Sequence, residues 1–292
     1  MKKIVNYILF YIVLIPLSWL PMWFLYLISS LLSFILEHII GYRTVVVENN
    51  LRNSFPELTE KEIQKIKNKF YKHLADIFLE AFKMLSISKK NLMKRYYCIN
   101  PEILKPYFDN KQSVLLVSAH YNNWEYMVLS LDMQINHHGI GVGKRMSNKV
   151  FGDLMHKKRT RFGTEVCYAD NTKETFEHYE KENIPCAYML LSDQSPNDKH
   201  RCYWTSFLNQ DTPVIFGAES LAKKYNYPIF YYTVRKLKRG YYSFDISPIT
   251  DNPQETAYGE ITEKHLSFLE KSIKENPQYW LWSHKRWKHK RN

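Results

Sequence analysis

From residue 113 onward, short apolar runs alternate with longer stretches in which apolar side chains recur at helical spacing. The runs predict strands at residues 113–118, 138–143, 164–168, 185–191, 228–234 and 241–246. Helical patterns occupy residues 124–133, 148–162, 172–181 and 214–225, and a last one covers residues 258–275. This alternation predicts an α/β fold with a mainly parallel central sheet flanked by helices.

Residues 59–88 form one long amphipathic pattern that precedes this region. Thr59 and Glu62 have the spacing of a capping box, in which each side chain binds a backbone N–H at the start of a helix. Apolar residues then recur at intervals of three or four, namely Ile63, Ile66, Phe70, Leu74, Ile77, Phe78, Ala81 and Leu85. We expect this stripe to pack against the core or to face a membrane, and not to form a site.

Residues 4–36 form an uncharged, largely apolar stretch near the N-terminus. About 20 apolar residues suffice to cross a bilayer, whereas the apolar core of a signal peptide has only about 7–15. Pro16 and Pro21 interrupt the stretch and predict a kink or a division into two helical pieces. We therefore expect a membrane anchor over residues 1–42 and a cytoplasmic domain over residues 43–292. A buried helix of a soluble protein is the alternative.

The chain has 41 Lys and Arg residues against 29 Asp and Glu residues, which gives a formal net charge of +12. Such a charge favours anionic partners: nucleic acid, anionic lipid or an acidic carrier protein. The sequence has neither a zinc-finger spacing nor an RNP-type motif, so nucleic acid is not an expected partner. Positive charge beside a membrane span stays on the cytoplasmic side. We expect a cytoplasmic domain held at the inner face of a membrane.

The segment LLVSAHYNNWEYMVL places a histidine and an acid directly after the first predicted strand. His120 titrates near neutral pH and is suited to act as a general base. Glu125 lies in the first turn of the following helix, where it can turn toward the imidazole and stabilise its charged form. The alternative is structural, with His120 closing the sheet and Glu125 favouring the helix N-terminus.

Two further polar groups follow predicted strands at the same edge of the sheet. A basic tract over residues 144–161 contains Lys144, Arg145, Lys149, Lys157, Lys158, Arg159 and Arg161. Arginine suits phosphate or carboxylate recognition, although a solvated helix face is the usual alternative. Asp193 and Gln194 follow the strand at residues 185–191. This carboxylate can pair with the arginines, position a substrate hydroxyl or simply belong to a turn.

The last residues, PQYWLWSHKRWKHKRN, interleave tryptophans with cations. That composition is typical of contact with an anionic membrane, and it also suits single-stranded nucleic acid. The third interpretation is a packed terminal segment with a basic end.

No motif indicates a cofactor or a metal. The sequence has no GxGxxG after a strand and no Walker-type loop. The four cysteines, Cys98, Cys167, Cys186 and Cys202, form no CxxC pair and no metal-ligand spacing with histidine. They are interpreted as reduced thiols of a domain that faces the cytosol, with a disulfide as the alternative. No serine or cysteine lies in a nucleophile elbow, so a covalent intermediate on such a side chain is not expected.

Taken in order, these blocks resemble a known family. The N-terminal apolar segment is followed by H-x4-E at His120 and Glu125, then by KRMSNKVFGDLMHKKRTRFG, SDQ, FLNQDTPVIFGAESLAKKYNYPIF and PQYWLWSHKRW. This set is similar to the late acyltransferases of lipid A biosynthesis, of the lauroyl and myristoyl type. They belong to the wider glycerolipid and lysophospholipid acyltransferase superfamily, and the resemblance covers nearly the whole chain.

The resemblance implies transfer of a fatty acyl chain from acyl carrier protein, or from acyl-CoA, to a hydroxyl of an anionic lipid A precursor. It implies His120 as general base and Glu125 as the acid that orients it. It places substrate binding at Arg145, Asn148, Arg159, Arg161, Asp193 and Gln194. The family often continues with Asp-Gln-Asp or a glycine-rich loop, where this chain has Ser195, Pro196 and Asn197.

Three rival interpretations remain open at this point. The same chemistry can act on another acceptor, such as a lysophospholipid, an aminolipid or a phosphoglycolipid. A non-enzymatic module that binds anionic membranes would use the basic face and would not need His120 or Glu125. A nucleic-acid binder at the membrane would show steep salt dependence.

Overall fold

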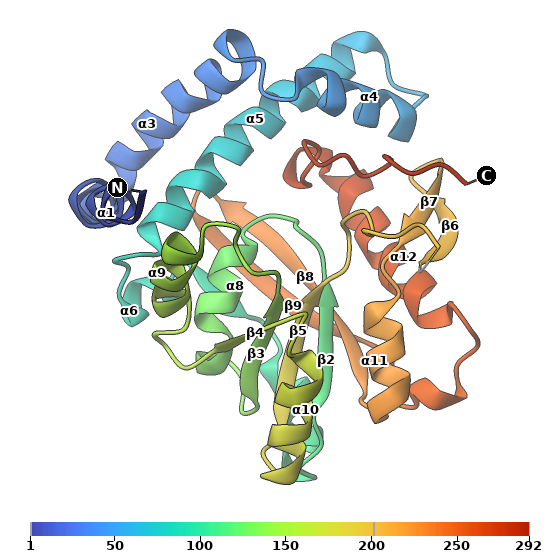
Figure 1. Ribbon diagram of the computed structural model, residues 1–292. Coiled ribbons are helices and arrows are strands. Elements are labelled where there is room, and N and C mark those ends of the chain that lie inside the picture. The colour runs from blue at the N-terminus through green and yellow to red at the C-terminus, as the bar shows by residue number, and fades with distance from the viewer. Residues whose placement is uncertain (1, 201, 292) are drawn as a thin grey trace.

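A computed structural model describes residues 2–200 and 202–291, and its centre is a curled, mostly parallel sheet (Figure 1). The strand order is β1-β9-β8-β2-β5-β3-β4, and β6 and β7 form a separate antiparallel pair. The strands are β1 (Tyr96–Cys98), β2 (Val114–Ser118), β3 (His138–Gly143), β4 (Glu165–Tyr168), β5 (Cys186–Leu191), β6 (Tyr203–Phe207), β7 (Gln210–Val214), β8 (Ile229–Lys238) and β9 (Tyr241–Thr250). The α/β fold predicted from the alternating pattern is therefore confirmed.

Helices cover both faces of the sheet, because its inner strands are apolar on both sides. The α-helices of the described residues are α1 (Lys2–Ile8), α2 (Ile15–Trp19), α3 (Met22–Phe34), α4 (Thr44–Ser54), α5 (Glu60–Lys83), α6 (Lys89–Met93), α7 (Lys105–Asp109), α8 (Trp124–Ser130), α9 (Lys149–Arg159), α10 (Thr172–Lys181), α11 (Gly217–Tyr225) and α12 (Glu260–Glu275). In β2, Leu115 and Val117 face one apolar cluster, whereas Val114 and Leu116 face the other. The fold thus has three layers.

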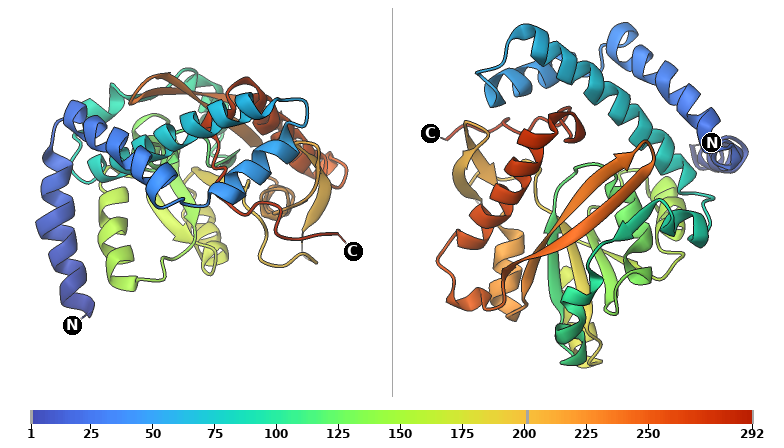
Figure 2. Two further views of the ribbon diagram at one scale, coloured as in Figure 1. Left: turned by 90° about the horizontal axis from the view of Figure 1, so that it is seen from above. Right: turned by 180° about the vertical axis from the view of Figure 1, so that it is seen from behind.

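The long helix predicted at residues 59–88 is α5, and its capping box is present as expected. The Thr59 side chain accepts from the Glu62 N–H, and the Glu62 carboxylate accepts from the Thr59 N–H. The helix ends at Lys83, five residues earlier than the pattern suggested. It runs diagonally beside α3 across one end of the sheet (Figures 1 and 2).

Three strands were not predicted, and the reason lies in their patterns. β1 has three residues, and most of β6 is only half-buried, so neither shows a continuous apolar run. β7 extends to Val214, so α11 begins at Gly217 and not at residue 214. β8 and β9 pair antiparallel as a long hairpin that continues beyond the predicted ends at residues 234 and 246.

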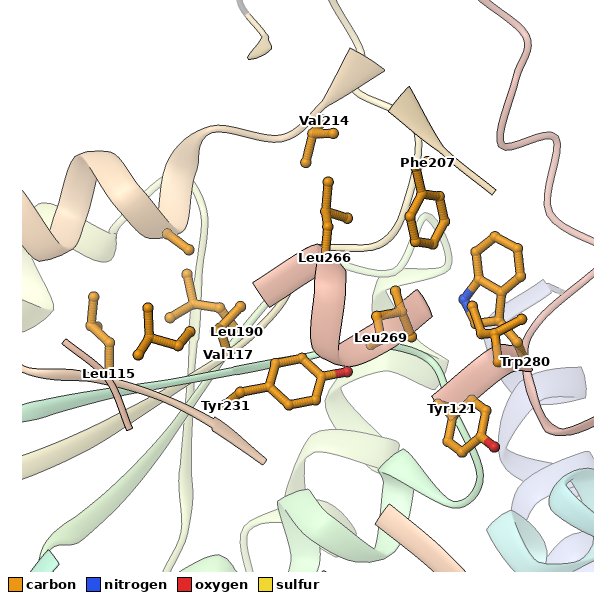
Figure 3. Close-up of a cluster of buried hydrophobic side chains, with 14 of the residues drawn as sticks. Leu115, Val117, Tyr121, Leu190, Phe207, Val214, Tyr231, Leu266, Leu269 and Trp280 are labelled. Carbon is orange, nitrogen blue, oxygen red and sulfur yellow. The ribbon is translucent and has the colours of Figure 1, made fainter. Parts of the chain in front are cut away.

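Figure 3 shows one part of the core, where strand side chains meet α12 and the β6–β7 pair. Leu266 and Leu269 of α12 pack in one cluster with Trp280 and Trp282 of the C-terminal segment. Trp280 is 2% exposed and Trp282 is fully buried. The tryptophans of this segment are therefore packing residues, and the packed alternative describes it better than a membrane or nucleic-acid contact.

The N-terminal apolar helices lie along the outside of the domain (Figure 2). Chain direction changes at Pro21, so the stretch is divided into two helical pieces. The span Met22–Ile39 is long and apolar enough to cross a membrane, and 22% of it is buried within the protein. On the outer surface, the side chains of Ile4, Ile12, Trp23, Leu27 and Leu31 are more than half exposed. This leaves a large apolar surface, of the kind that marks a membrane or protein contact.

Candidate active site

Two parallel strands, β2 and β5, bring the central residues of the site together. Ser118 at the end of β2 pairs with Leu191 at the end of β5, so the chain leaves the sheet at the same level in both strands. His120 comes two residues after Ser118, and Asp193 comes two residues after Leu191. The register therefore places the imidazole and the carboxylate side by side, at the sheet edge where α/β proteins bind ligands.

The Asp193 carboxylate holds the His120 imidazole through one ring nitrogen. Nδ1 of His120 lies 2.7 Å from Oδ1 of Asp193. Oδ2 of Asp193 accepts from the backbone N–H of His120 at 3.0 Å and from the indole N–H of Trp280 at 2.9 Å. A carboxylate on Nδ1 favours the tautomer that carries its proton there, which leaves the lone pair on Nε2.

The surroundings of this pair set its protonation. Burial alone would lower the pKa of His120, but the charge and the hydrogen bond of Asp193, and to a lesser extent the charge of Glu125, raise it overall. Burial would raise the pKa of Asp193, but the charge of His120 and the hydrogen bonds from His120 and Trp280 hold it below its usual range. The ionised carboxylate can therefore stabilise the imidazolium that forms when His120 accepts a proton.

Nε2 of His120 is the atom that remains for chemistry. The Gln194 side-chain nitrogen lies 3.3 Å from it, and the Trp124 ring meets the imidazole edge-on at 5.2 Å. The His120 side chain is 18% exposed, against 3% for Asp193. An accessible imidazole backed by a buried carboxylate can remove the proton from a bound hydroxyl.

Glu125 is engaged elsewhere in this arrangement. Its two oxygens accept from Nε and Nη2 of Arg159 at 2.9 and 2.6 Å, in a bidentate pair between α8 and α9. The sequence interpretation placed Glu125 against His120, whereas the structure gives that contact to Asp193. Asp193 takes this position because the register of β2 and β5 places its carboxylate beside Nδ1 of His120. Glu125 binds Arg159 instead, because the planar guanidinium can donate two parallel hydrogen bonds to a carboxylate.

Two cavities meet at His120. The smaller has a volume of about 150 Å³ and lies between α8 and strands β3 to β5; its lining includes Glu125 and Arg159 and the side chains of Trp124, Val128, Val166, Tyr168, Met189 and Leu191. The larger has a volume of about 600 Å³ and extends over Gln194 and the residues that follow it toward the start of α11. Lys144 lines both cavities, so a cation stands at the point where they join.

The remaining predicted binding residues lie away from His120. Arg145 is exposed, pairs with Asp170 at 2.9 Å and stacks on Tyr168. Asn148 caps α9 by accepting from the Phe151 N–H. Arg161 donates to the carbonyl oxygens of Lys158, at the end of α9, and of Ile87, in the loop before α6. Of the predicted set, the structure gathers Glu125, Arg159, Asp193 and Gln194 around His120.

The C-terminal segment supplies two site residues that the sequence interpretation did not single out. Trp280 donates to Asp193, and Nε2 of His284 accepts from the Ser195 N–H at 3.0 Å. Burial lowers the pKa of His284 to about 4, so this ring is neutral and can accept. Both residues lie in the block PQYWLWSHKRW. The resemblance of this block to the family is the sequence feature that could have identified them as part of the site.

Comparison with known proteins identifies one match that spans nearly the whole chain. The model of a family described as bacterial lipid A biosynthesis acyltransferase matches residues 2–289. A comparison with curated proteins gave no match.

Proposed function

The chain belongs to the bacterial lipid A biosynthesis acyltransferase family, and on this basis we propose that it moves a fatty acyl chain from acyl carrier protein to a hydroxyl of a lipid A precursor. Acyl-CoA is the alternative donor. The observation that carries the proposal is the His120 imidazole, held at Nδ1 by a buried carboxylate and turned toward two adjoining cavities.

The proposed reaction is a direct transfer. Nε2 of His120 takes the proton of the acceptor hydroxyl, and the oxygen attacks the thioester carbonyl. The carbon–sulfur bond then breaks, and the leaving thiolate takes the proton back from the imidazolium. Asp193 stays ionised and stabilises the positive charge on the ring while it lasts. Neither serine nor cysteine takes part.

We assign the two cavities to the two parts of the substrate. The smaller one has mostly apolar walls, which suit an acyl chain. The larger one carries the polar side chains of Gln194 and Asn197 beside Lys144, which suit a phosphorylated sugar headgroup. The overall charge of +12 also favours an acidic carrier protein as donor.

Gly141 offers a test of the acyl-chain cavity, because it lines that cavity without a side chain. A Cβ there would lie 3.5 Å from Met189 and 3.7 Å from Val128, which is ordinary contact. Gly141→Leu is expected to lower kcat/KM for the longest accepted acyl chain by about 10- to 200-fold, with a smaller loss for shorter chains. The measurement is kcat/KM across donors of graded length.

Gly141→Ala is the matched control, since its single methyl group fits and should change the chain-length preference only slightly. An equal loss for every donor length in Gly141→Leu would place the acyl chain elsewhere.

Glu125 has a proposed role that differs from that of Asp193. As the partner of Arg159, it keeps α9 against α8 and closes one wall of the smaller cavity. Glu125→Gln should weaken this pair and lower kcat/KM about 10-fold. If Glu125 instead orients the imidazole during the reaction, its loss should equal that of Asp193→Asn.

We further propose that residues 1–42 anchor the enzyme in the inner membrane and that residues 43–292 form the acyltransferase domain on the cytoplasmic side. The exposed apolar side chains of α1 and α3 support the anchor. The basic character of the rest of the chain supports the orientation. In this arrangement the anchor packs against the domain, since the Phe10 and Phe151 rings meet at 6.0 Å between the N-terminal helices and α9.

The experiment that tests the function uses the purified full chain in detergent. Labelled acyl-carrier-protein and acyl-CoA donors are offered with a panel of lipid A precursors and lysolipids, and mass spectrometry follows the gain of an acyl group. We expect a gain on a lipid A precursor that is lost in His120→Ala. If only a lysophospholipid gains an acyl group, the acceptor belongs to that class and not to the lipid A precursors. If wild type and His120→Ala give equal gains, His120 is not the general base.

A further inference from the structure

A buried polar cluster joins the candidate membrane helix α3 to the loop that carries His120. Its centre is two carboxylates one turn apart on α5, Asp76 and Glu80, whose side chains are almost completely buried. They lie on the buried face of α5, which is mostly apolar and also holds His73. Buried carboxylates are costly unless each oxygen finds a partner, so the partners indicate what the cluster does.

The two oxygens of Glu80 bind different parts of the protein. Oε1 accepts from the Tyr26 hydroxyl of α3 at 2.9 Å. Oε2 accepts from the Asn123 side-chain amide at 2.6 Å and from the Tyr242 hydroxyl of β9 at 2.9 Å. The Glu80 carboxylate thus connects α3, through Tyr26, to the segment after β2, through Asn123.

Asn123 is the residue through which this carboxylate reaches the site. Its Oδ1 accepts from the Tyr126 N–H at 2.9 Å and so caps α8, the helix that follows the His120 loop. The preceding residue, Asn122, has a left-handed backbone with φ of 57° and donates to the Val234 carbonyl. The path from His120 to α8 is therefore fixed by side-chain hydrogen bonds, and Glu80 holds one of them.

Asp76 fastens α3 to the same helix. It accepts from the Ser29 hydroxyl at 2.7 Å and from the Arg239 guanidinium at 2.6 Å. Arg239 also lies over the Tyr26 ring, 4.4 Å from its centroid. Gly240, with φ of 74°, leaves room for the tyrosine, since a Cβ there would overlap the Tyr26 hydroxyl.

The opposite side of α3 is free for another contact. Trp23, Leu27 and Leu31 are exposed, whereas Leu25, Ser29 and Ser33 are buried against the domain. A membrane contact on the outer side of α3 and the polar contacts on its inner side therefore use different faces of one helix. A change in how α3 is seated would move the Tyr26 hydroxyl relative to Glu80.

We propose that Glu80 is a positioning residue that couples the seating of α3 to the loop carrying His120. When α3 is docked, Tyr26 fixes the Glu80 carboxylate, which fixes Asn123 and the start of α8. When α3 is displaced, Oε1 loses its partner, and the loop loses a restraint. The expected change in kcat rests on the proposed function, in which His120 is the base. The expected change in the mobility of the loop does not depend on that role.

Tyr26→Phe tests the coupling with one hydroxyl removed. We expect kcat to fall about tenfold with KM nearly unchanged, and backbone amide exchange at residues 121–126 to become faster by a similar factor. Tyr11→Phe is the matched control, since it removes a hydroxyl from an exposed tyrosine of the same apolar region. Neither readout should change in the control.

Glu80 itself is tested by a conservative and a truncating variant. Burial and the neighbouring Asp76 raise the pKa of the Glu80 carboxyl, and glutamine can replace it with the same shape. Glu80→Gln should keep kcat within about threefold of wild type, while Glu80→Ala should lose at least tenfold. The effects of Tyr26→Phe and Asn123→Ala on kcat should be less than additive, because both act through Glu80.

The outcomes separate this inference from the proposed function. Wild-type kcat and wild-type exchange in Tyr26→Phe would overturn the coupling, whatever His120→Ala does. Strictly additive effects of Tyr26→Phe and Asn123→Ala would overturn it as well. Faster exchange in Tyr26→Phe beside an active His120→Ala would support the coupling and reject the proposed base instead.

Discussion

Replacing His120 by alanine is expected to lower kcat for acyl transfer by roughly 10²- to 10⁴-fold, the usual contribution of a general base. KM should change little, because the imidazole acts on the hydroxyl proton and the cavity walls hold the substrate. The neighbouring Gln194 and Trp124 cannot take over, since neither side chain accepts a proton near neutral pH. The measurement is steady-state kinetics on the full chain, with mass spectrometry of the acylated product.

His178→Ala is the matched control, because His178 is an exposed histidine of α10. It should keep wild-type kinetics. Thermal unfolding of both variants should match wild type closely enough to exclude a folding defect. A His120→Ala enzyme with wild-type kcat would contradict the mechanism and make this histidine a structural residue.

Asp193→Asn is expected to lower kcat by roughly 10²- to 10⁴-fold through a different physical route. The amide removes the negative charge that stabilises imidazolium, and it can present a donor to Nδ1 and so turn the proton to Nε2. The ring would then lack its lone pair where the acceptor hydroxyl binds. The loss should appear in kcat more than in KM.

The pH dependence of kcat/KM gives this prediction a second readout. Activity requires neutral His120, and Asp193 raises the pKa of that ring, so the acidic limb of the wild-type profile should lie above the ordinary histidine value. Without the carboxylate charge the pKa falls, and the limb should move to lower pH. The plot of kcat/KM against pH for Asp193→Asn should therefore have a lower maximum and an acidic limb at lower pH than that of wild type.

Asp198→Asn is the control for this change, because Asp198 lines the larger cavity without contacting His120. Its acidic limb should stay at the wild-type position. An Asp193→Asn enzyme with an unshifted limb and wild-type kcat, beside a strongly impaired Glu125→Gln enzyme, would return the orienting role to Glu125.

Much of the fold followed from local patterns. The apolar runs predicted β2, β3, β4 and β5 within one residue at each end, because each run is bounded by turns or polar residues and those of β2 and β5 are buried on both faces. The capping box at Thr59 predicted the start of α5. The weakly patterned β6 and β7 were missed, since a half-exposed hairpin carries no continuous apolar signal.

The candidate site was predictable only in part. Its location was, because His120 and Asp193 each follow a strand, and parallel strands end at one edge of the sheet. The resemblance of the ordered motifs indicated the family, which the match over residues 2–289 confirmed. The hydrogen bonds of Trp280 and His284 to the loop at Asp193 and Ser195 were not predictable from spacing, because those residues lie about 90 positions away in the sequence.

The sequence by itself determined the α/β class with a mainly parallel sheet, the family and the sheet edge at which the candidate site lies. Only the tertiary structure decided which carboxylate meets His120. That choice depends on the register of β2 with β5, which joins residues 73 positions apart, and on Arg159, which reaches Glu125 from another helix. The same holds for Glu80 beneath α3: local patterns specify which face of a helix is buried, whereas the partners on that face are set by long-range packing.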